Sequence, residues 1–441
     1  MSTPVTTLNN PRTIRAWAFF DWANSSYALV ISVAIFPAYY TQVTSEQISI
    51  GSVSISNSGL YAFSISAAYL LIATLSPFLS GIADYGGKKK GFMRFFTTMG
   101  SLACISMFFF KGDTGLHQAV QPIGQLILGT GSFMVATIGF AGALVFYNAF
   151  LPEIASEDQY DRVSAKGFSY GYIGSVILLI FNLLVITYPT AFGLPGEGTL
   201  PIRLAFVTVG LWWFGFAQIP FRGLPADHPG QPIRKLLTKG FKELRKTWLV
   251  VRSEANILGF LSAFFFYSAG VQTVLFLAAT FAEKELHFAT SQLIIIILLL
   301  QLVAILGAML FARLSEKRGN KFALITMLCI WVCICVLAYF VENATQFYFI
   351  AAAVGTVMGG IQSLSRSTYS KLLPVGTEDT ASFFSFYDIL EKSAIVLGTF
   401  SFGIIEQITG GMRNSVLALI LFFVIGLVLL SKVRIKHSRE K

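Results

Sequence analysis

The sequence predicts an all-α integral membrane protein in which twelve transmembrane helices form two pseudo-symmetric six-helix bundles. The first observation is the composition, with 55% hydrophobic residues, only 12% charged residues and a mean hydropathy of +0.69. Soluble domains carry roughly 25% charged residues, about twice as many. The second observation is a series of apolar runs of roughly 20 residues, the length that crosses ~30 Å of hydrocarbon. The third is an internal repeat.

The apolar runs are continuous and not alternating, which favours helices over the strands of a barrel. Lipid offers no partner to backbone polar groups, so each run has to be helical. The first run is too long for the core of a signal peptide and has no small-residue cleavage pattern close behind, so we expect it to stay attached. The expected spans are 14–40, 59–82, 93–111, 121–149, 165–188, 200–220, 255–282, 288–312, 321–341, 345–370, 382–407 and 412–431.

Basic residues predict the orientation, because Lys and Arg beside the spans are retained in the cytoplasm. With the amino terminus inside, the even-numbered gaps hold dense basic runs such as KKK at 88–90, whereas the odd gaps hold only Lys111, Lys284 and Arg413. We therefore expect a protein of the bacterial plasma membrane with both termini in the cytoplasm. The net charge of +10 is then a topology signal, and no nucleic-acid partner is expected.

The longest gap divides the chain into an N-terminal six-helix unit (1–220), a linker (221–254) and a C-terminal six-helix unit with a cytoplasmic tail (255–441). The linker opens with the turn signals of RGLPADHPGQP. Apolar residues from Ile233 to Trp248 then recur at helical spacing opposite four lysines. This pattern predicts a basic amphipathic helix on the inner membrane surface, near anionic headgroups. The alternative is a surface linker without a regulatory role.

An internal repeat relates the two halves, the usual construction of secondary transporters. SGIADYGGKKKGF (80–92) corresponds to ARLSEKRGNKFAL (312–324), and FYNAFLPEI at 146–154 corresponds to TYSKLLPVG at 368–376. The first alignment pairs Asp84 with Glu316, Gly87 with Gly319 and Lys89 with Lys321; the second pairs Tyr147 with Tyr369.

The first repeated stretch resembles the loop signature of the major facilitator superfamily, which Ala83, Asp84, Gly87, Lys88 and Lys89 match. The resemblance implies the major facilitator fold, and a loop that braces the two halves in one conformation and releases them in another. A carboxylate in a tight turn can accept hydrogen bonds from a helix N-terminus. The stretch departs from the signature at Ser80, where a glycine is usual, and at Tyr85, where an arginine is common.

Four stretches carry a closer resemblance: FFDWANSSYA, GIADYGGKKK, FYNAFLPEI and VSAKGFSYGYIGS. Together they resemble the autophagy-related vacuolar effluxer branch of that superfamily. The branch includes bacterial members that carry the label "unknown major facilitator". The resemblance is clear over the first six spans and weak over the second six. It implies transport. Eukaryotic members are linked to amino-acid export from the vacuole, but nothing in these motifs recognises an amino acid.

Asp21 lies inside the first apolar run, where a charge costs at least ~2.5 kcal/mol on insertion scales unless it faces protein or water. Asp21, Asn24 and Ser25 share one face of that helix. We expect this face to line the central cavity, as the first helix does in the superfamily. The alternative is a buried, hydrogen-bonded contact between the first and fifth spans.

Polar residues in other spans supply further candidates for binding the substrate or a coupling ion. Asp388 and Lys392 are four apart and are expected to pair, which leaves Glu391 over. Gln362 and Arg366 are four residues apart on the tenth span and are further candidates. Alternatively, Arg366 lies at the cytoplasmic mouth and contacts lipid phosphate. The remaining candidates are Tyr147, Asn148, Tyr267, Gln272 and Gln301. Small-residue rows at Gly167, Gly171 and Gly174, and at Gly355, Gly359 and Ser363, favour close helix packing.

The sequence therefore predicts a secondary active transporter that moves a small solute, an amino acid or similar metabolite with efflux as one direction, by alternating access between the halves. Asp21 or Glu391 is expected to carry a coupling proton, because a carboxylate in low dielectric can be neutral. An amphiphile or drug exporter and a non-transporting sensor remain alternatives. We expect a monomer. We expect no cofactor or metal, because the cysteines lack metal-binding spacing and all four histidines fall in loops or the tail. We expect no enzyme, because no nucleophile and base come together.

Overall fold

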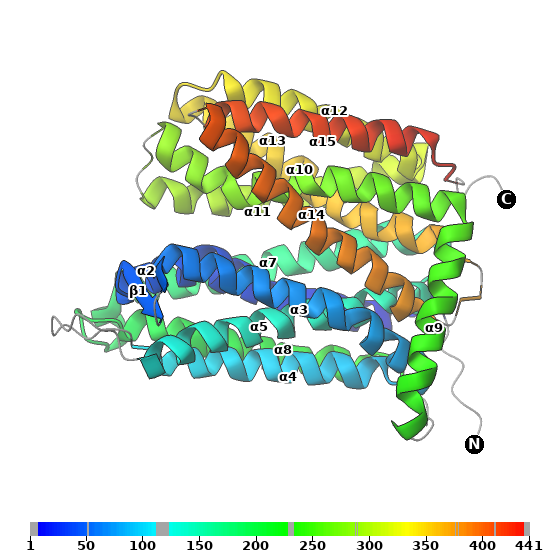
Figure 1. The fold of residues 1–441 in the computed structure, drawn as a ribbon, viewed down its shortest axis with the longest axis horizontal. Helices are drawn as coiled ribbons and strands as arrows, with labels where there is room; N and C mark the ends of the chain where they lie inside the picture. The colour runs from blue at the N-terminus through cyan, green and yellow to red at the C-terminus, as the bar shows by residue number, and fades with distance from the viewer. Residues whose placement is uncertain are drawn as a thin grey trace.

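The computed structural model describes residues 8–50, 53–111, 123–227, 233–286, 288, 290–374, 376–377, 379–409 and 412–435. Figure 1 shows two stacked bundles of helices, with both chain ends at the same end of the molecule. We call this end, which carries Pro11, Gly86 and Leu372, the terminal end. The four histidines, His117, His228, His287 and His437, lie outside the described residues.

The N-terminal bundle begins with one long broken helix. α1 (Pro11–Ser26), the π-helical η1 (Tyr27–Ile35) and α2 (Phe36–Val43) together cover the expected span 14–40. An antiparallel hairpin follows, β1 (Gln47–Ile50) and β2 (Val53–Ser56), with Gln47 opposite Ser56; the sequence did not predict it. The other elements of this bundle are α3 (Asn57–Gly86), α4 (Lys89–Ser106), η2 (Met107–Phe109), α5 (Ile123–Ala149), α6 (Leu151–Ile154), η3 (Glu157–Gln159), α7 (Tyr160–Thr187), η4 (Pro189–Phe192) and α8 (Leu200–Gly223).

The C-terminal bundle follows α9 (Ile233–Ser253), a helix that crosses the terminal end and packs against α3 and α14 (Figure 1). Its elements are α10 (Ala255–Leu286), α11 (Thr290–Arg318), α12 (Asn320–Tyr339), α13 (Ala344–Leu372), α14 (Thr380–Thr409) and α15 (Met412–Lys432).

Within the described residues, eleven helical segments are long and apolar enough to span a membrane. The twelfth long helix of the two bundles is α14, which covers the expected span 382–407. It differs because Asp388, Glu391 and Lys392 lie within five consecutive positions. The predicted twelve-helix fold in two bundles is confirmed, and the exceptional span is the one that carries a group of charges.

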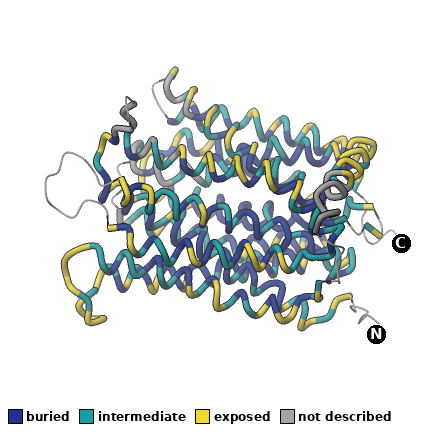
Figure 2. The backbone as a smooth tube through the Cα atoms, turned by 60° about the horizontal axis from the view of Figure 1, so that its bottom comes forward, coloured by how far each residue is buried: buried dark blue, intermediate teal, exposed yellow. Residues whose placement is uncertain are grey.

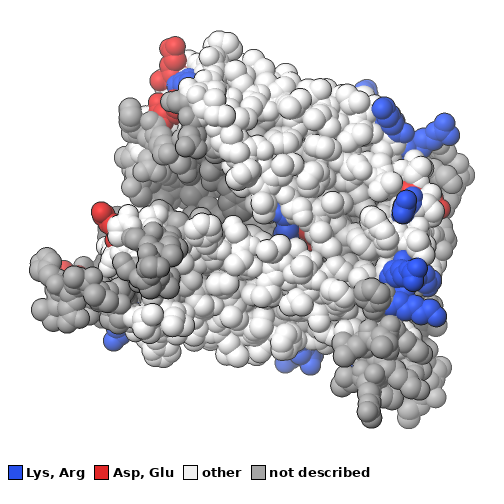
Figure 3. Space-filling model, viewed as in Figure 1, with Lys and Arg blue, Asp and Glu red and all other residues white. Residues whose placement is uncertain are grey.

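The outer surface is apolar over most of its length. Leu70 is 69% exposed and Phe349 74% exposed, and Figure 3 shows basic side chains gathered at the terminal end, while the middle of the molecule is mostly uncharged. Buried residues gather between the helices (Figure 2). Such a large apolar surface is unfavourable in water and suits hydrocarbon.

The π-helical stretch in the first span ends at Ile35, close to Pro37. Pro37 lacks an N–H, so the helix cannot close its usual bond to the carbonyl four residues earlier. Tyr61 of α3 donates to the backbone oxygen of Ser32 at 3.3 Å, so a neighbouring helix supplies a partner to this segment. Irregular turns of this kind are frequent at functional sites, and they were not predicted from the hydrophobic pattern.

Candidate functional site

An arginine of the C-terminal bundle is inserted into the N-terminal bundle. Arg366 lies near the end of α13 and is only 2% exposed. Its Nη1 lies 3.4 Å from Asp21 Oδ2 of α1 and donates to Asn148 Oδ1 of α5 at 3.2 Å. Its Nε and Nη2 donate to the hydroxyl and the backbone oxygen of Ser164 on α7, each at 2.9 Å. One guanidinium thus joins three helices of the opposite bundle.

Aromatic rings enclose this guanidinium. Arg366 Cζ lies 4.3 Å from the ring centroid of Phe168, 4.7 Å from that of Trp17 and 5.3 Å from that of Tyr147. Trp17 stacks on Tyr147 with 4.5 Å between centroids and donates to its backbone oxygen at 3.0 Å. Rings that are fixed in place attract a cation, more strongly where water is absent. The three rings therefore stabilise the guanidinium of Arg366 in its buried position.

Asp21 is the acid that balances Arg366. It is 5% exposed, and Tyr147 donates to its Oδ2 at 2.7 Å. A buried charge needs a partner and hydrogen bonds to be tolerated, and Asp21 has both. In this conformation Asp21 lies in a sealed contact between the bundles and not on the wall of a cavity. The alternative position of Arg366, at the mouth against lipid phosphate, is wrong, because the side chain is buried against Asp21.

The face that carries Asp21 packs tightly on α7, where the glycine row allows close approach. A Cβ built on Gly167 would lie 2.7 Å from Asp21 Oδ2, one on Gly171 2.5 Å from Ser25 Oγ, and one on Gly174 2.7 Å from the backbone oxygen of Trp22. The predicted packing role of this row is confirmed. Asn24 is buried on α1, and its side-chain atoms have no hydrogen-bond partner among the described residues.

A second polar group lies on α14 and faces the N-terminal bundle. We call Asp388, Glu391 and Lys392 the α14 triad. Lys392 Nζ lies 2.8 Å from Asp388 Oδ1, 3.2 Å from Glu391 Oε2 and 5.8 Å from the ring centroid of Tyr69 on α3. Gln272 of α10 donates to Glu391 Oε1 at 3.3 Å. The predicted pair of Asp388 and Lys392 is confirmed, but Glu391 is not left over, because it shares the same lysine.

The other candidates lie in smaller contacts. Tyr172 of α7 donates to Gln362 Oε1 of α13 across the bundle interface at 2.6 Å. Tyr267 of α10 shares a hydrogen bond of 2.7 Å with Ser365 of α13, inside the C-terminal bundle. Gln301 is partly buried on α11 and belongs to none of the hydrogen-bonded groups described above.

The loop after α3 is hydrogen-bonded to the first turn of α14. Asp84 accepts the backbone N–H groups of Ser382 at 2.7 Å and of Ala381 at 3.2 Å. Lys89 Nζ lies 3.1 Å from Asp84 Oδ1 and donates to Thr380 Oγ1 at 2.7 Å. The partial positive charge of a helix N-terminus favours a carboxylate there. The turn itself uses Gly87, with φ +59, followed by the partly buried Lys88.

The repeated loop after α11 makes its contact through different residues. Glu316, which aligns with Asp84, is exposed, Gly319 takes φ +84, and Lys321 donates to the backbone oxygen of Ser431 at 2.6 Å. The buried acid at this junction is Asp161, in the first turn of α7. It accepts from Ser315 Oγ and Asn320 Nδ2, each at 2.7 Å, and pairs with Lys371 Nζ at 2.8 Å.

Asp161 was not recognised from the sequence. In EDQYDR it looks like one of several solvated loop acids. Its position just before the expected span 165–188, in a gap that the basic residues assign to the same side as the repeated loop, was the available signal. The polarity of the junction is reversed: in one half the loop supplies the carboxylate, and in the other half the helix does.

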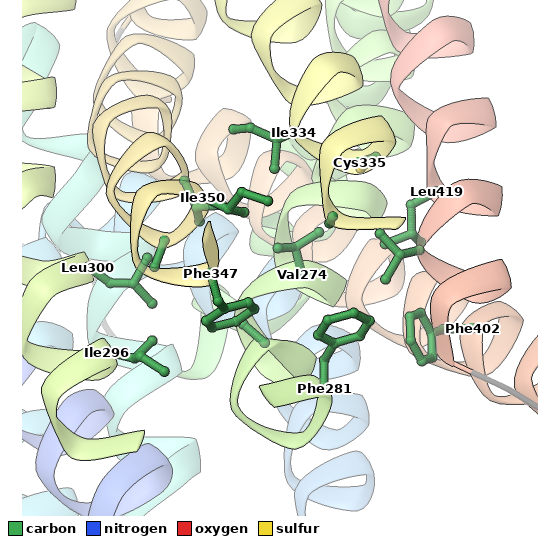
Figure 4. A pocket seen from close by; sticks show the side chains of 15 residues that line it. Val274, Phe281, Ile296, Leu300, Ile334, Cys335, Phe347, Ile350, Phe402 and Leu419 are labelled. Atoms are coloured by element: carbon green, nitrogen blue, oxygen red, sulfur yellow. The ribbon is translucent and has the colours of Figure 1, made fainter. Parts of the chain in front are cut away.

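A purely apolar pocket lies within the C-terminal bundle, with an empty volume of about 570 Å³ that includes the part open to the surface. Its lining comes from every helix of the C-terminal bundle, α10 to α15, and Figure 4 shows Phe281, Phe347 and Phe402 among the side chains around it. It lacks polar atoms that could orient a charged solute.

Solved structures share this architecture. One of them is titled a Major Facilitator Superfamily transporter, FucP, in the outward conformation; it has a TM-score of 0.68 and 13% identity, and the alignment covers 97% of this chain and 99% of that one. A bacterial homologue of the iron transporter ferroportin in the outward-facing state has a TM-score of 0.66 and 12% identity over 96% and 98% of the two chains. The fold is that of a major facilitator.

Relatives in sequence narrow the class. An MFS-type transporter, YxiO, of Bacillus subtilis (strain 168) is 34% identical over 96% of this chain and 95% of its own length. Autophagy-related protein 22 of Saccharomyces cerevisiae (strain ATCC 204508 / S288c) is 24% identical over 88% of this chain and 79% of its own. The protein is therefore a transporter of the major facilitator type and not an enzyme. Residues 9–441 match the family described as "Vacuole effluxer Atg22 like", and the chain belongs to that family.

Proposed function

We propose that the protein is a secondary active transporter that moves a small solute by alternating access. We propose further that its conformation here is the one closed at the terminal end. The single observation that carries this proposal is the position of the polar contacts between the bundles. Asp21, Asp84 and Asp161 all contact the opposite bundle in the half of the molecule near the terminal end. If the hydrogen bonds and ion pairs between the described parts of the two bundles gather toward one end, the bundles can part at the other end by rocking about the contacts.

These contacts are suited to reversible use. Each joins charged or polar groups across the bundle interface, and such groups can exchange their protein partners for water when the bundles part. We take residues 1–220 and 255–441 as the moving units and 221–254 as their connection. Asp84, Gly87, Lys88 and Lys89 form one releasable contact between the bundles. Gly319 and Lys321 of the repeated loop belong to the other, whose acid is Asp161, whereas the predicted gating residue Glu316 is exposed and belongs to neither contact.

The closed end faces the cytoplasm in our proposal. Basic residues gather there (Figure 3), and basic residues are retained inside. The relative in Bacillus subtilis supports a bacterial plasma membrane, where anionic headgroups would contact the basic end. One chain supplies both bundles, which supports a monomer as the working unit.

For the solute we propose an amino acid or similar metabolite, moved outward. The family description as an effluxer supports the direction. Opposite charges within the spans, at Asp21 with Arg366 and in the α14 triad, provide both signs that a zwitterion needs. The apolar pocket of the C-terminal bundle supports the second candidate, an exporter of amphiphiles or drugs. A sensor without flux is the third.

Glu391 and Asp21 are our candidates for the coupling proton, and they differ in access. The Glu391 side chain is 26% exposed, whereas that of Asp21 is 7% exposed and enclosed by Arg366 and Tyr147. Glu391 can therefore exchange a proton in this conformation, while Asp21 becomes accessible only after the bundles part.

The test uses the full chain in proteoliposomes with an imposed proton gradient. A thermal-shift screen against amino acids, peptides, sugars and lipids first identifies ligands, since a ligand of the native state raises apparent stability. We then expect gradient-driven flux of the best ligand, reduced at least tenfold in Asp21→Asn or Glu391→Gln and unchanged in the exposed control Glu316→Gln. Binding without flux would identify a sensor, and unchanged pH-dependent flux in both variants would remove these acids from the mechanism.

A further inference from the structure

The α14 triad carries two acids and one base, so with all three groups ionised its net charge is negative. Asp388 and Lys392 are buried, with side chains only 4% and 6% exposed. Asp21 and Arg366 balance one another elsewhere in the spans and supply no spare cation. A net charge within a span is unfavourable unless a mobile counter-charge accompanies it.

One atom of the triad shows where that counter-charge can bind. Asp388 Oδ1 holds the ammonium of Lys392 at 2.8 Å, but Asp388 Oδ2 is buried and has no hydrogen-bond partner among the described residues. A buried acceptor without a donor costs free energy and is rare. The free oxygen is either protonated or occupied by a donor from outside the chain.

The surroundings favour an organic cation over a metal ion. Described residues contain no group of three or more His, Cys, Asp or Glu side chains that could hold a metal. The titratable groups facing the triad from neighbouring helices are Tyr69 of α3 and Tyr267 of α10, and Tyr387 lies on α14 itself. Tyrosine rings attract ammonium groups through their faces, and a tyrosine hydroxyl can accept a hydrogen bond.

The triad lies partway along α14, and one of its three side chains is partly exposed. Lys392 lies twelve residues after the start of α14, which places it roughly 18 Å along the helix at 1.5 Å per residue. Glu391 is the partly exposed member, at 26%.

We infer that the α14 triad binds the ammonium group of the transported solute in exchange for one proton. The protonated acid loses its proton to water as the ammonium binds the resulting carboxylate, so one positive charge leaves as one arrives. Proton and solute compete for the same carboxylate. Exchange of this kind couples outward movement of the solute to inward movement of a proton, and this inference rests on the proposed transport function.

The experiment measures proton release when ligand binds to the full chain in lipid nanodiscs, in weak buffer with a pH-indicator dye. The probes are propylammonium, L-alanine and L-lysine; 1-propanol and lactate are the matched compounds without an ammonium group. We expect release approaching one proton per protein at saturation with at least one ammonium probe, and none with the matched compounds.

Variants then assign the release to the triad. Asp388→Asn keeps the size of the side chain and should abolish the release, Glu391→Gln should reduce it at least threefold, and Glu316→Gln should leave it unchanged. Melting temperatures of the three variants report whether each still folds. If Asp388→Asn fails to fold, the same comparison with Glu391→Gln decides.

The inference is overturned if no ammonium probe releases protons from the wild-type protein, or if release persists in full in both triad variants. Flux measurements separate this failure from that of the proposed function. Solute flux in proteoliposomes that does not depend on the triad or on protons leaves transport standing and removes only the ammonium site.

Discussion

Arg366 and Asp21 form an ion pair between the two bundles, with Nη1 3.4 Å from Oδ2 across a sequence separation of 345 residues. The arginine enters from α13, and the acid stands on α1 beside Tyr147. Since both side chains are buried, the pair can persist only while the bundles touch. It therefore reports directly on the closed conformation.

Removing one member of this ion pair should lower the stability of the protein more than removing both members. Arg366→Ala leaves Asp21 buried without its partner, a change that typically destabilises by about 3–5 kcal/mol. The double variant Asp21→Asn, Arg366→Gln should be more stable than Arg366→Ala. Thermal unfolding in detergent measures this, with the exposed Arg162→Ala as control. A melting temperature for Arg366→Ala equal to that of the control would contradict the prediction.

The two junctions at Asp84 and Asp161 should act together to hold the terminal end closed. Each carboxylate is shared by donors from the other bundle, so Asp84→Asn or Asp161→Asn weakens one junction and leaves the second. The double variant should open the terminal end far more than either single change. Arg162 and Arg313 are both exposed. Spin labels on Arg162→Cys and Arg313→Cys report the distance between the two bundles by pulsed electron paramagnetic resonance.

That measurement needs a background without Cys104, Cys329, Cys333 and Cys335. Glu316→Gln serves as the matched control, because Glu316 aligns with Asp84 but is exposed. Identical distance distributions in the double variant and in the wild type would show that these carboxylates do not hold the bundles together.

The hydrophobic pattern was sufficient to predict the spanning helices, because lipid imposes one secondary structure on every span. The pairing of Asp388 with Lys392 was also predictable, since residues four apart meet on one helix. The partner of Arg366 was not, because helix contacts between distant spans depend on packing that no local pattern records. Glu316 illustrates the same limit: its alignment with Asp84 is sound, yet Asp161 on another helix is the buried acid at that junction.

The glycine row of α7 makes a separate prediction about stability. An alanine at Gly174 would place its Cβ 2.7 Å from the backbone oxygen of Trp22, which a backbone atom cannot easily avoid. Overpacking of this kind typically costs about 1–3 kcal/mol. Gly215→Ala on α8 is the control, since its Cβ meets nothing within 4 Å and alanine favours helix by about 1 kcal/mol. Melting temperatures should therefore move in opposite directions; a fall in both would point to helix propensity or lipid contact instead.

The orientation can be tested with single cysteines at the two ends of the molecule. Lys242 lies exposed on α9 at the terminal end, and Glu342 lies exposed in the connection between α12 and α13. If basic residues mark the cytoplasmic side, a membrane-impermeant maleimide added to intact bacteria should label Glu342→Cys at once. Lys242→Cys should react only after the cells are permeabilised, in the same cysteine-free background. The reverse labelling pattern would place the closed end outside the cell, and the same polar contacts would then hold shut the external gate.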